Sequence, residues 1–184
     1  MFYQLTSKTF SAAMSSPDNT GVSCHHINNL QLLDAVRQRF EQLLDDESTN
    51  KTHHFDGRFE NIYPDKSRFP EMDQLSVFLL DLARQRLGTE AELQLGYWFN
   101  LMGPGHTTSL HTHEENDELL SGVCYLQVPD ESGDIVFPAG DNTHRLTPQT
   151  GDVYLFSPSL PHLVEKNCSS ENRLSVAFNI GPRR

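Results

Sequence analysis

Cysteine is scarce in this chain of 184 residues, which has only Cys24, Cys124 and Cys168. No two of them have the C-x-x-C spacing of zinc knuckles or redox motifs, and an odd number does not suit a disulfide framework. Scattered thiols of this kind are typical of reduced proteins, so the sequence predicts a cytoplasmic location. A chain of this length can bury about 70% of its unfolded surface without such cross-links.

Long apolar runs and basic residues are also in short supply. No stretch approaches the ~20 apolar residues that cross a bilayer, and the N-terminus lacks the order of a secretory signal, so we predict no membrane association. Lys and Arg total 14 against 25 Asp and Glu, a net charge of −11, which would repel a phosphate backbone. We therefore expect no nucleic acid partner, and a small molecule or a protein as substrate. Whether the chain forms a homodimer is left open.

Two amphipathic helices are predicted in the first half of the chain. From Leu30 the apolar residues recur with helical spacing, and this stripe fades at the acidic run 45–47. A second stripe runs from Leu75 to Leu87, and Gly88 supplies a stop signal. The polar stretch between the helices, residues 45–69, is expected to be irregular.

After Gly88 the apolar period changes from helical to alternating, which indicates strands. Two helices followed by short strands predict helices packed on one face of a β-sandwich or barrel. We expect a single domain, 1–184, with a helical support region at 1–90 and a β core at 91–181. The strand candidates are 93–101, 120–128, 134–137, 152–156, 162–166 and 174–180.

Three of the nine histidines have the spacing of metal ligands. His111 and His113 are two residues apart, and in an extended segment such residues project to the same side. His162 follows a proline-rich turn and is the third candidate, because two close ligands and a distant one can form a facial site with open positions. Glu115 is an alternative ligand, since His113 and Glu115 form an equally spaced pair that would give two histidines and one carboxylate.

An H-x-H pair on its own is more often two surface histidines, so the spacing needs support from other residues. The pairs His25–His26 and His53–His54 have no such support. Adjacent residues in a strand point in opposite directions, so we assign these four histidines no role.

Arg173 supports the interpretation of the histidines as part of a functional site. It shares one face of the last predicted strand with Ser175, Ala177 and Asn179, whereas the opposite face is apolar. A guanidinium that points into a barrel needs an anionic partner, and its planar fork suits a carboxylate. That partner is either an internal Asp or Glu or the carboxylate of a bound molecule.

Together these residues closely resemble the Fe(II)- and 2-oxoglutarate-dependent oxygenases, particularly small microbial and phage proteins of that superfamily. The resemblance covers about residues 96–181 and is specific as a combined motif. The motif comprises Trp98-Phe-Asn100, Gly105, His111-Thr-His113, Leu120-Ser-Gly-Val-Cys-Tyr-Leu126, Gly151-Asp-Val-Tyr-Leu-Phe156, Pro158, His162 and Arg173-Leu-Ser175.

The resemblance implies a mainly β fold with N-terminal helices, in which the β core is a double-stranded β-helix (a cupin-like jelly roll). It implies a dioxygenase that uses Fe(II) and 2-oxoglutarate to hydroxylate a small molecule or a protein side chain. His111 and His162 would bind iron, with His113 in the position often held by Asp. Arg173 would bind the distal carboxylate of 2-oxoglutarate, assisted by Tyr125 and Ser175.

One departure from the family pattern concerns the third ligand. Residues 114–119 form a loop about two residues longer than usual, so alignment from the left pairs His111 with His113, and alignment from Ser121 backwards pairs His113 with Glu115. The first alignment is favoured because the spacing from Trp98 to His111 needs no gap.

A cupin-like metalloprotein is the main alternative. The segment from Gly105 to His113 also satisfies the G-x5-H-x-H signature of cupins, with Glu118 in the expected acidic position. Such a protein could be an isomerase, an oxygenase that does not use 2-oxoglutarate, or a ligand-binding module. A cupin has no particular need for Arg173, so this residue distinguishes the two interpretations.

Overall fold

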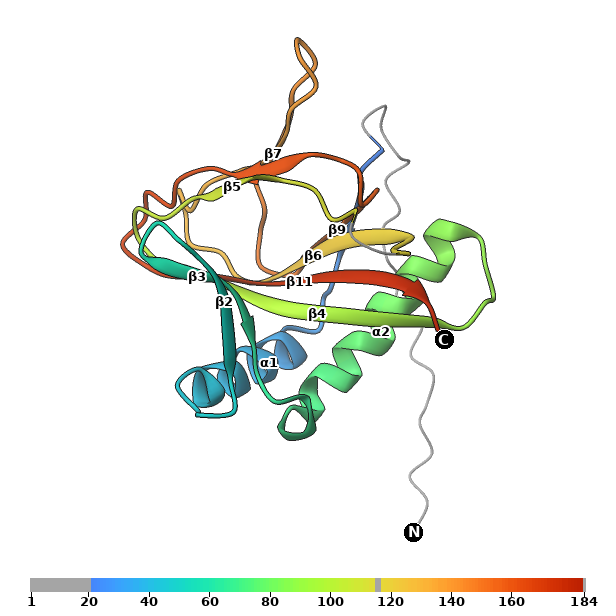
Figure 1. Cartoon of the computed structure of the whole chain (residues 1–184), viewed down its shortest axis with the longest axis horizontal. Helices are drawn as coiled ribbons and strands as arrows, with labels where there is room; N and C mark the ends of the chain where they lie inside the picture. Colours follow the sequence, from blue (N-terminus) through green and yellow to red (C-terminus); the bar gives the residue numbers. More distant parts are fainter. Residues whose placement is uncertain (1–20, 115–116, 184) are drawn as a thin grey trace.

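Strands predominate in a computed structural model that describes residues 21–114 and 117–183. Within these residues there are two α-helices, one 3₁₀ turn and eleven strands (Figure 1). In chain order they are β1 (Ser23–His26), α1 (Leu30–Leu43), β2 (Asn50–Phe55), β3 (Arg58–Tyr63), η1 (Lys66–Arg68), α2 (Pro70–Leu87), β4 (Leu93–Met102), β5 (Thr108–His111), β6 (Leu120–Gln127), β7 (Ile135–Phe137), β8 (His144–Leu146), β9 (Asp152–Phe156), β10 (His162–Val164) and β11 (Arg173–Pro182).

The strands form two antiparallel sheets. The larger has the order β1-β9-β6-β11-β4-β3-β2, and the smaller has the order β5-β10-β7-β8. Strand β11 lies at the centre of the larger sheet, where it pairs with β4 along its whole length and with β6 on its other side. The prediction of a mainly β chain with helices in its first half is confirmed.

Both helices lie on one face of the larger sheet, and the smaller sheet lies on the other (Figure 1). The helices begin and end where local signals dictate: the Asn29 side chain accepts a hydrogen bond from the Leu32 amide at the start of α1, and Gly88 ends α2 with a φ of 62°. Their apolar stripes pack on the sheet, and the stacked rings of Phe40 and Phe99 join the two layers with centroids 4.4 Å apart.

The two faces of β11 have different partners, as its sequence predicts. One face contributes to the core under the helices, and the other lines a cavity between the two sheets. The core-facing residues are Leu174, Val176, Phe178 and Ile180, and the cavity-facing residues are Arg173, Ser175, Ala177 and Asn179.

The prediction that residues 45–69 are irregular is wrong. Strands β2 and β3 form a hairpin at one edge of the larger sheet, and η1 follows it. Their side chains are polar and mostly exposed, so they lack the apolar alternation that marks a strand in a sequence. The turn itself is an Asp56-Gly57 pair with φ values of 48° and 79°, a strong hairpin signal that the composition of the stretch obscured.

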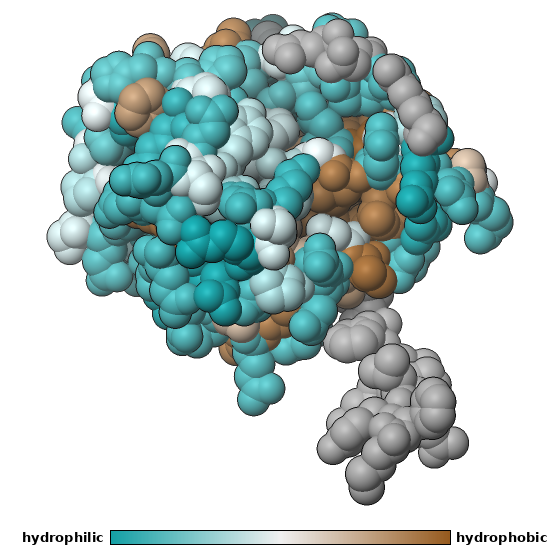
Figure 2. Space-filling model, turned by 60° about the horizontal axis from the view of Figure 1, so that its bottom comes forward, coloured by the Kyte–Doolittle hydropathy of each residue, from teal (hydrophilic) through white to brown (hydrophobic). Residues whose placement is uncertain are grey.

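The surface on the helix side is mostly hydrophilic, with one compact group of exposed hydrophobic side chains (Figure 2). Neither helix in the described ranges has the length and apolar character needed to cross a membrane.

Candidate metal centre

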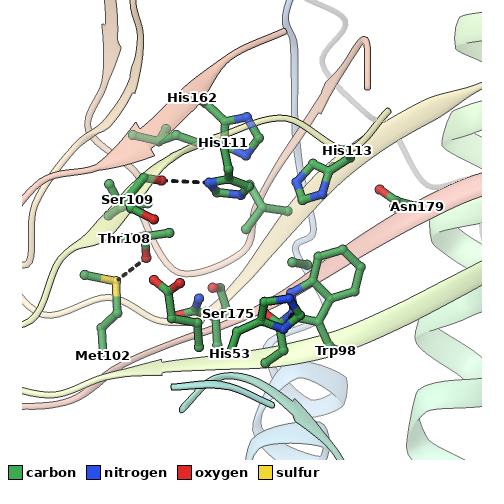
Figure 3. A pocket seen from close by; sticks show the side chains of 18 of the residues that line it. His53, Trp98, Met102, Thr108, Ser109, His111, His113, His162, Ser175 and Asn179 are labelled. Carbon is green, nitrogen blue, oxygen red and sulfur yellow. Dashed lines mark hydrogen bonds between the residues drawn. The ribbon is translucent and has the colours of Figure 1, made fainter. Parts of the chain in front are cut away.

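Three histidines from separate segments meet at one side of the cavity. His111 ends β5, His162 begins β10, and the two are register partners in the smaller sheet. His113 follows β5, where its amide donates a hydrogen bond of 2.8 Å to the Pro158 carbonyl. One potential ligand atom from each of the three rings lies within 4.8 Å of the others, and the rings point toward one another (Figure 3).

Backbone carbonyls set the tautomers of two of these rings. The Nδ1 of His111 lies 2.7 Å from the Ser109 carbonyl, and the Nδ1 of His162 lies 3.0 Å from the Leu160 carbonyl. A carbonyl oxygen can only accept, so each Nδ1 carries a proton, and Nε2 is the atom of each ring that can bind a metal. This arrangement is the one by which protein histidines are oriented for metal binding.

Burial keeps two of the imidazoles neutral. It lowers the pKa of His162 to about 3, and it lowers that of His113 to about 4, where the neighbouring His111 lowers it further. A ligating imidazole must be unprotonated, so both rings are in the required state at neutral pH. Three converging histidine nitrogens suit a divalent transition metal such as Fe(II) and leave positions open for other ligands.

The cavity between the sheets has a volume of about 310 Å³ and is lined by both polar and apolar side chains. The histidine cluster and Arg173 belong to the same cavity. Tyr125 and Ser175, which the sequence also assigned to this site, line it as well. The predicted site residues therefore share one enclosed space.

Arg173 is almost completely buried, with 2% of its surface exposed. It donates hydrogen bonds to the carbonyls of Ser132 and Gly133 and to the Tyr125 hydroxyl, and its guanidinium lies 4.9 Å from the centre of the Tyr125 ring. No ion pair links it to a carboxylate in the described part of the chain. The internal Asp or Glu partner considered as an alternative is thus not found there.

Gly133 is required where it is. Its φ is 93°, and a Cβ at this position would collide with the backbone of Glu165. A glycine therefore lets the loop before β7 approach the smaller sheet and present two carbonyls to Arg173.

Burial raises the pKa of Tyr125 to about 12. The phenol therefore keeps its proton at neutral pH. Its oxygen accepts the hydrogen bond from Arg173, so the O–H is available as a donor to a group in the cavity.

Sequence reasoning missed the part of the cavity that the β2–β3 hairpin supplies. His53, which we assigned no role, lines the cavity, as do Glu60 and Tyr63. Figure 3 shows His53 and Trp98 on the other side of the cavity from His111 and His162. The Asp56-Gly57 turn is the sequence signal that could have identified this hairpin. His54 does not line the cavity, and His25 and His26 lie in β1.

The alternative ligand Glu115 lies outside the described residues. His113 belongs to the cluster through its own ring, which lies 4.9 Å from His111 and 5.1 Å from His162 between centroids.

No family model matches the sequence, and no curated protein does. A comparison of folds, in contrast, finds similar solved structures. A prolyl-4-hydroxylase of Pseudomonas putida is 21% identical over 90% of this chain and 95% of its own, with a TM-score of 0.66. The non-haem, α-ketoglutarate-dependent carbocyclase SnoK of nogalamycin biosynthesis is 16% identical over 89% and 80%, with a TM-score of 0.72.

A third structure is described with its small ligands. HygX of Streptomyces hygroscopicus, with nickel and 2-oxoglutarate bound, is 16% identical over 89% of this chain and 83% of its own, with a TM-score of 0.62. At these identities the likeness concerns the fold. The chain thus has the fold of the Fe(II)- and 2-oxoglutarate-dependent oxygenases, as its sequence motif indicates.

Proposed function

We propose that this protein is a non-haem Fe(II)- and 2-oxoglutarate-dependent dioxygenase that hydroxylates a small molecule or a protein side chain. The observation that carries the proposal is Arg173, a buried guanidinium without a carboxylate partner in the described residues, in the same cavity as three converging histidines. Burial of an unpaired charge is costly, so the site is built for an anion. The shared fold of known 2-oxoglutarate enzymes supports the choice of that anion.

The architecture supports a jelly roll as the finer description of the fold. Two antiparallel sheets enclose the cavity, and the histidines come from the smaller sheet and the loop that follows β5. In this proposal residues 91–181 are the catalytic core, and residues 1–90 supply the supporting helices and one wall of the cavity.

His111, His113 and His162 would hold the metal. Burial keeps the rings of His113 and His162 neutral, and backbone carbonyls orient the rings of His111 and His162. Together, Fe(II) and 2-oxoglutarate would couple oxidative decarboxylation of the cosubstrate to oxidation of a C–H bond. The protein's share is to position the reactants and exclude water.

Arg173 would bind the distal carboxylate of 2-oxoglutarate with the help of Tyr125 and Ser175. The guanidinium supplies positive charge, and the protonated phenol of Tyr125 supplies a further donor. The Ser175 side chain lines the cavity two residues along the same strand face, where its hydroxyl can donate or accept.

The test is an anaerobic titration of the Fe(II)-loaded protein with 2-oxoglutarate. A chelated complex should give a weak visible charge-transfer band near ~500 nm, and admission of air should then yield succinate. A protein that binds Fe(II) but gives neither the band nor saturable 2-oxoglutarate binding would instead be a cupin-like metalloprotein, the alternative that has no need for Arg173.

A further inference from the structure

The wall of the cavity formed by the β2–β3 hairpin carries one acidic side chain. Glu60 of β3 lines the cavity, and its side chain is only 14% exposed. It is the sole carboxylate among the described residues that line this space, and Arg173 is the sole arginine. The cavity therefore presents one anionic group and one cationic group.

Glu60 has one oxygen committed to the protein. Its Oε1 lies 3.3 Å from the guanidinium of Arg58, which is itself buried. Within the described residues, Oε2 has no hydrogen-bond partner, so it is available as an acceptor.

Arg58 does not depend on Glu60 alone. Its guanidinium also donates to four uncharged oxygens. These are Asn100 Oδ1, the Leu101 and Thr107 carbonyls and Thr108 Oγ1. Arg58 thus has several acceptors besides Glu60, and the second oxygen of Glu60 remains for another cation.

Two aromatic rings line the same cavity. Tyr63 and Trp98 lie on neighbouring strands, with ring centroids 6.5 Å apart and planes tilted by 39°. Aromatic faces attract an ammonium or guanidinium within about 6 Å, and Trp does so most strongly. The Trp98 ring also lies 5.5 Å from that of His113, so a group bound here is next to the candidate metal centre.

We propose that this wall is the substrate subsite and that it takes an organic cation, an ammonium or guanidinium group, between Glu60 and the rings of Trp98 and Tyr63. The inference rests on the proposed function and names the substrate class for it. A basic amino-acid side chain and a small-molecule amine share this chemistry. The net charge of −11 also favours the approach of cations from solution.

The experiment uses Trp98, the chain's only tryptophan, as a fluorescent reporter. The metal-free parent protein is titrated with Nα-acetyl-L-lysine methylamide, with its neutral counterpart Nα-acetyl-L-norleucine methylamide, and with agmatine. We expect the lysine derivative to bind at least about tenfold more tightly than the norleucine derivative, the size of one charge-assisted contact. Tighter binding of agmatine than of the lysine derivative would identify a free amine as the source, and the reverse a basic side chain.

Variants assign the effect to Glu60. In Glu60→Gln the preference for the cation should fall about tenfold, since the neutral amide keeps the shape but loses the charge. Glu92→Gln removes the same charge from a side chain that is 80% exposed and outside the cavity, and it should keep the preference. Thermal melts check that both variants fold.

Two results would overturn this proposal. One is equal affinity of the parent for the lysine and norleucine derivatives, which requires no variant. The other is an unchanged cation preference in folded Glu60→Gln. Because these titrations contain neither Fe(II) nor 2-oxoglutarate, they are independent of the anaerobic absorption test. A normal band near ~500 nm without cation binding removes only the substrate class.

Discussion

Two buried arginines, one on the β2–β3 hairpin and one that lines the cavity from β11, have different surroundings. Arg58 on the hairpin has a carboxylate partner in Glu60, whereas Arg173 on β11 has carbonyls and a phenol but no carboxylate among the described residues. Both are buried to a similar extent, with 7% and 2% exposed. The difference teaches that burial alone does not mark a binding residue: the arginine without a counter-ion among the described residues is the one that we propose binds an anionic ligand.

The histidines of the two walls give the first and largest test of this contrast. Replacing His111 or His162 by Ala should abolish stoichiometric Fe(II) binding, because each removes an oriented donor from a three-donor site. His53→Ala, on the hairpin wall, should leave Fe(II) binding intact, and so should His54→Ala. Anaerobic equilibrium dialysis with metal analysis measures this. Parent-like iron binding by both the His111 and the His162 variants would contradict the site.

The arginines themselves give the next test. Arg173→Ala should weaken 2-oxoglutarate binding by about 2–5 kcal/mol, or roughly 30- to 5,000-fold, and still bind iron. Arg173→Lys should recover only part of this loss, because an ammonium lacks the two-pronged contact. The affinity is measured by anaerobic titration with Fe(II) present. Unchanged affinity in Arg173→Ala would favour a cupin-like protein.

The matched change on the hairpin wall is Arg58→Ala. It should leave 2-oxoglutarate affinity unchanged but lower the free energy of unfolding by about 3–5 kcal/mol, as expected when one partner of a buried ion pair is removed. Chemical denaturation checks the stability. If Arg58→Ala lost cosubstrate affinity and Arg173→Ala did not, the roles assigned to the two arginines would be reversed.

A smaller effect distinguishes the two candidates for the third ligand. His113→Ala should weaken Fe(II) binding more than Glu115→Ala, because loss of a ligand should exceed the ~10–100-fold effect typical of residues that only support one. Competition with a chelator of known affinity gives both values. The opposite order would make His113 and Glu115 the ligand pair and give a site of two histidines and one carboxylate.

A final test uses the pH dependence of the metal-free protein. The folded pKa values of about 3 for His162 and about 4 for His113 lie below the unfolded value, so the unfolded chain takes up protons first as the pH falls. Stability should thus decline from pH 6.5 toward pH 4, by about 1 kcal/mol per histidine between pH 6.5 and 5.5. Denaturation of His162→Gln should show a shallower decline, and a flat profile in the parent would contradict the buried neutral rings.

The contrast between the walls also separates what the sequence predicts from what it conceals. Strand β11 alternates between large apolar residues and small or polar ones, so its core face and the cavity face that carries Arg173 could both be predicted. The two helices could be predicted in the same way, from their apolar stripes and from the stop signal at Gly88. Where one face of an element is buried, its apolar residues recur with the period of that element, so the element can be predicted from the sequence.

The hairpin wall has no such periodicity. Strand β2 exposes most of its residues, and His53 has a φ of 54°, which breaks the regular alternation. Its side chain is held by Asn61, whose amide lies 3.0 Å from His53 Nδ1. That contact depends on the pairing of β2 with β3, so it could not be predicted from two adjacent histidines in a polar stretch. Exposed elements that contribute little to the core are the parts that sequence patterns describe least.

The carbonyl cradle around Arg173 has an entropic consequence. A free arginine side chain loses about 2 kcal/mol of rotamer entropy when it is immobilised. Here the loop with Ser132 and Gly133 and the ring of Tyr125 already restrict the guanidinium before any ligand arrives. In the role that we propose for Arg173, an incoming carboxylate would meet a preorganised receptor, and more of the contact energy would remain as binding affinity.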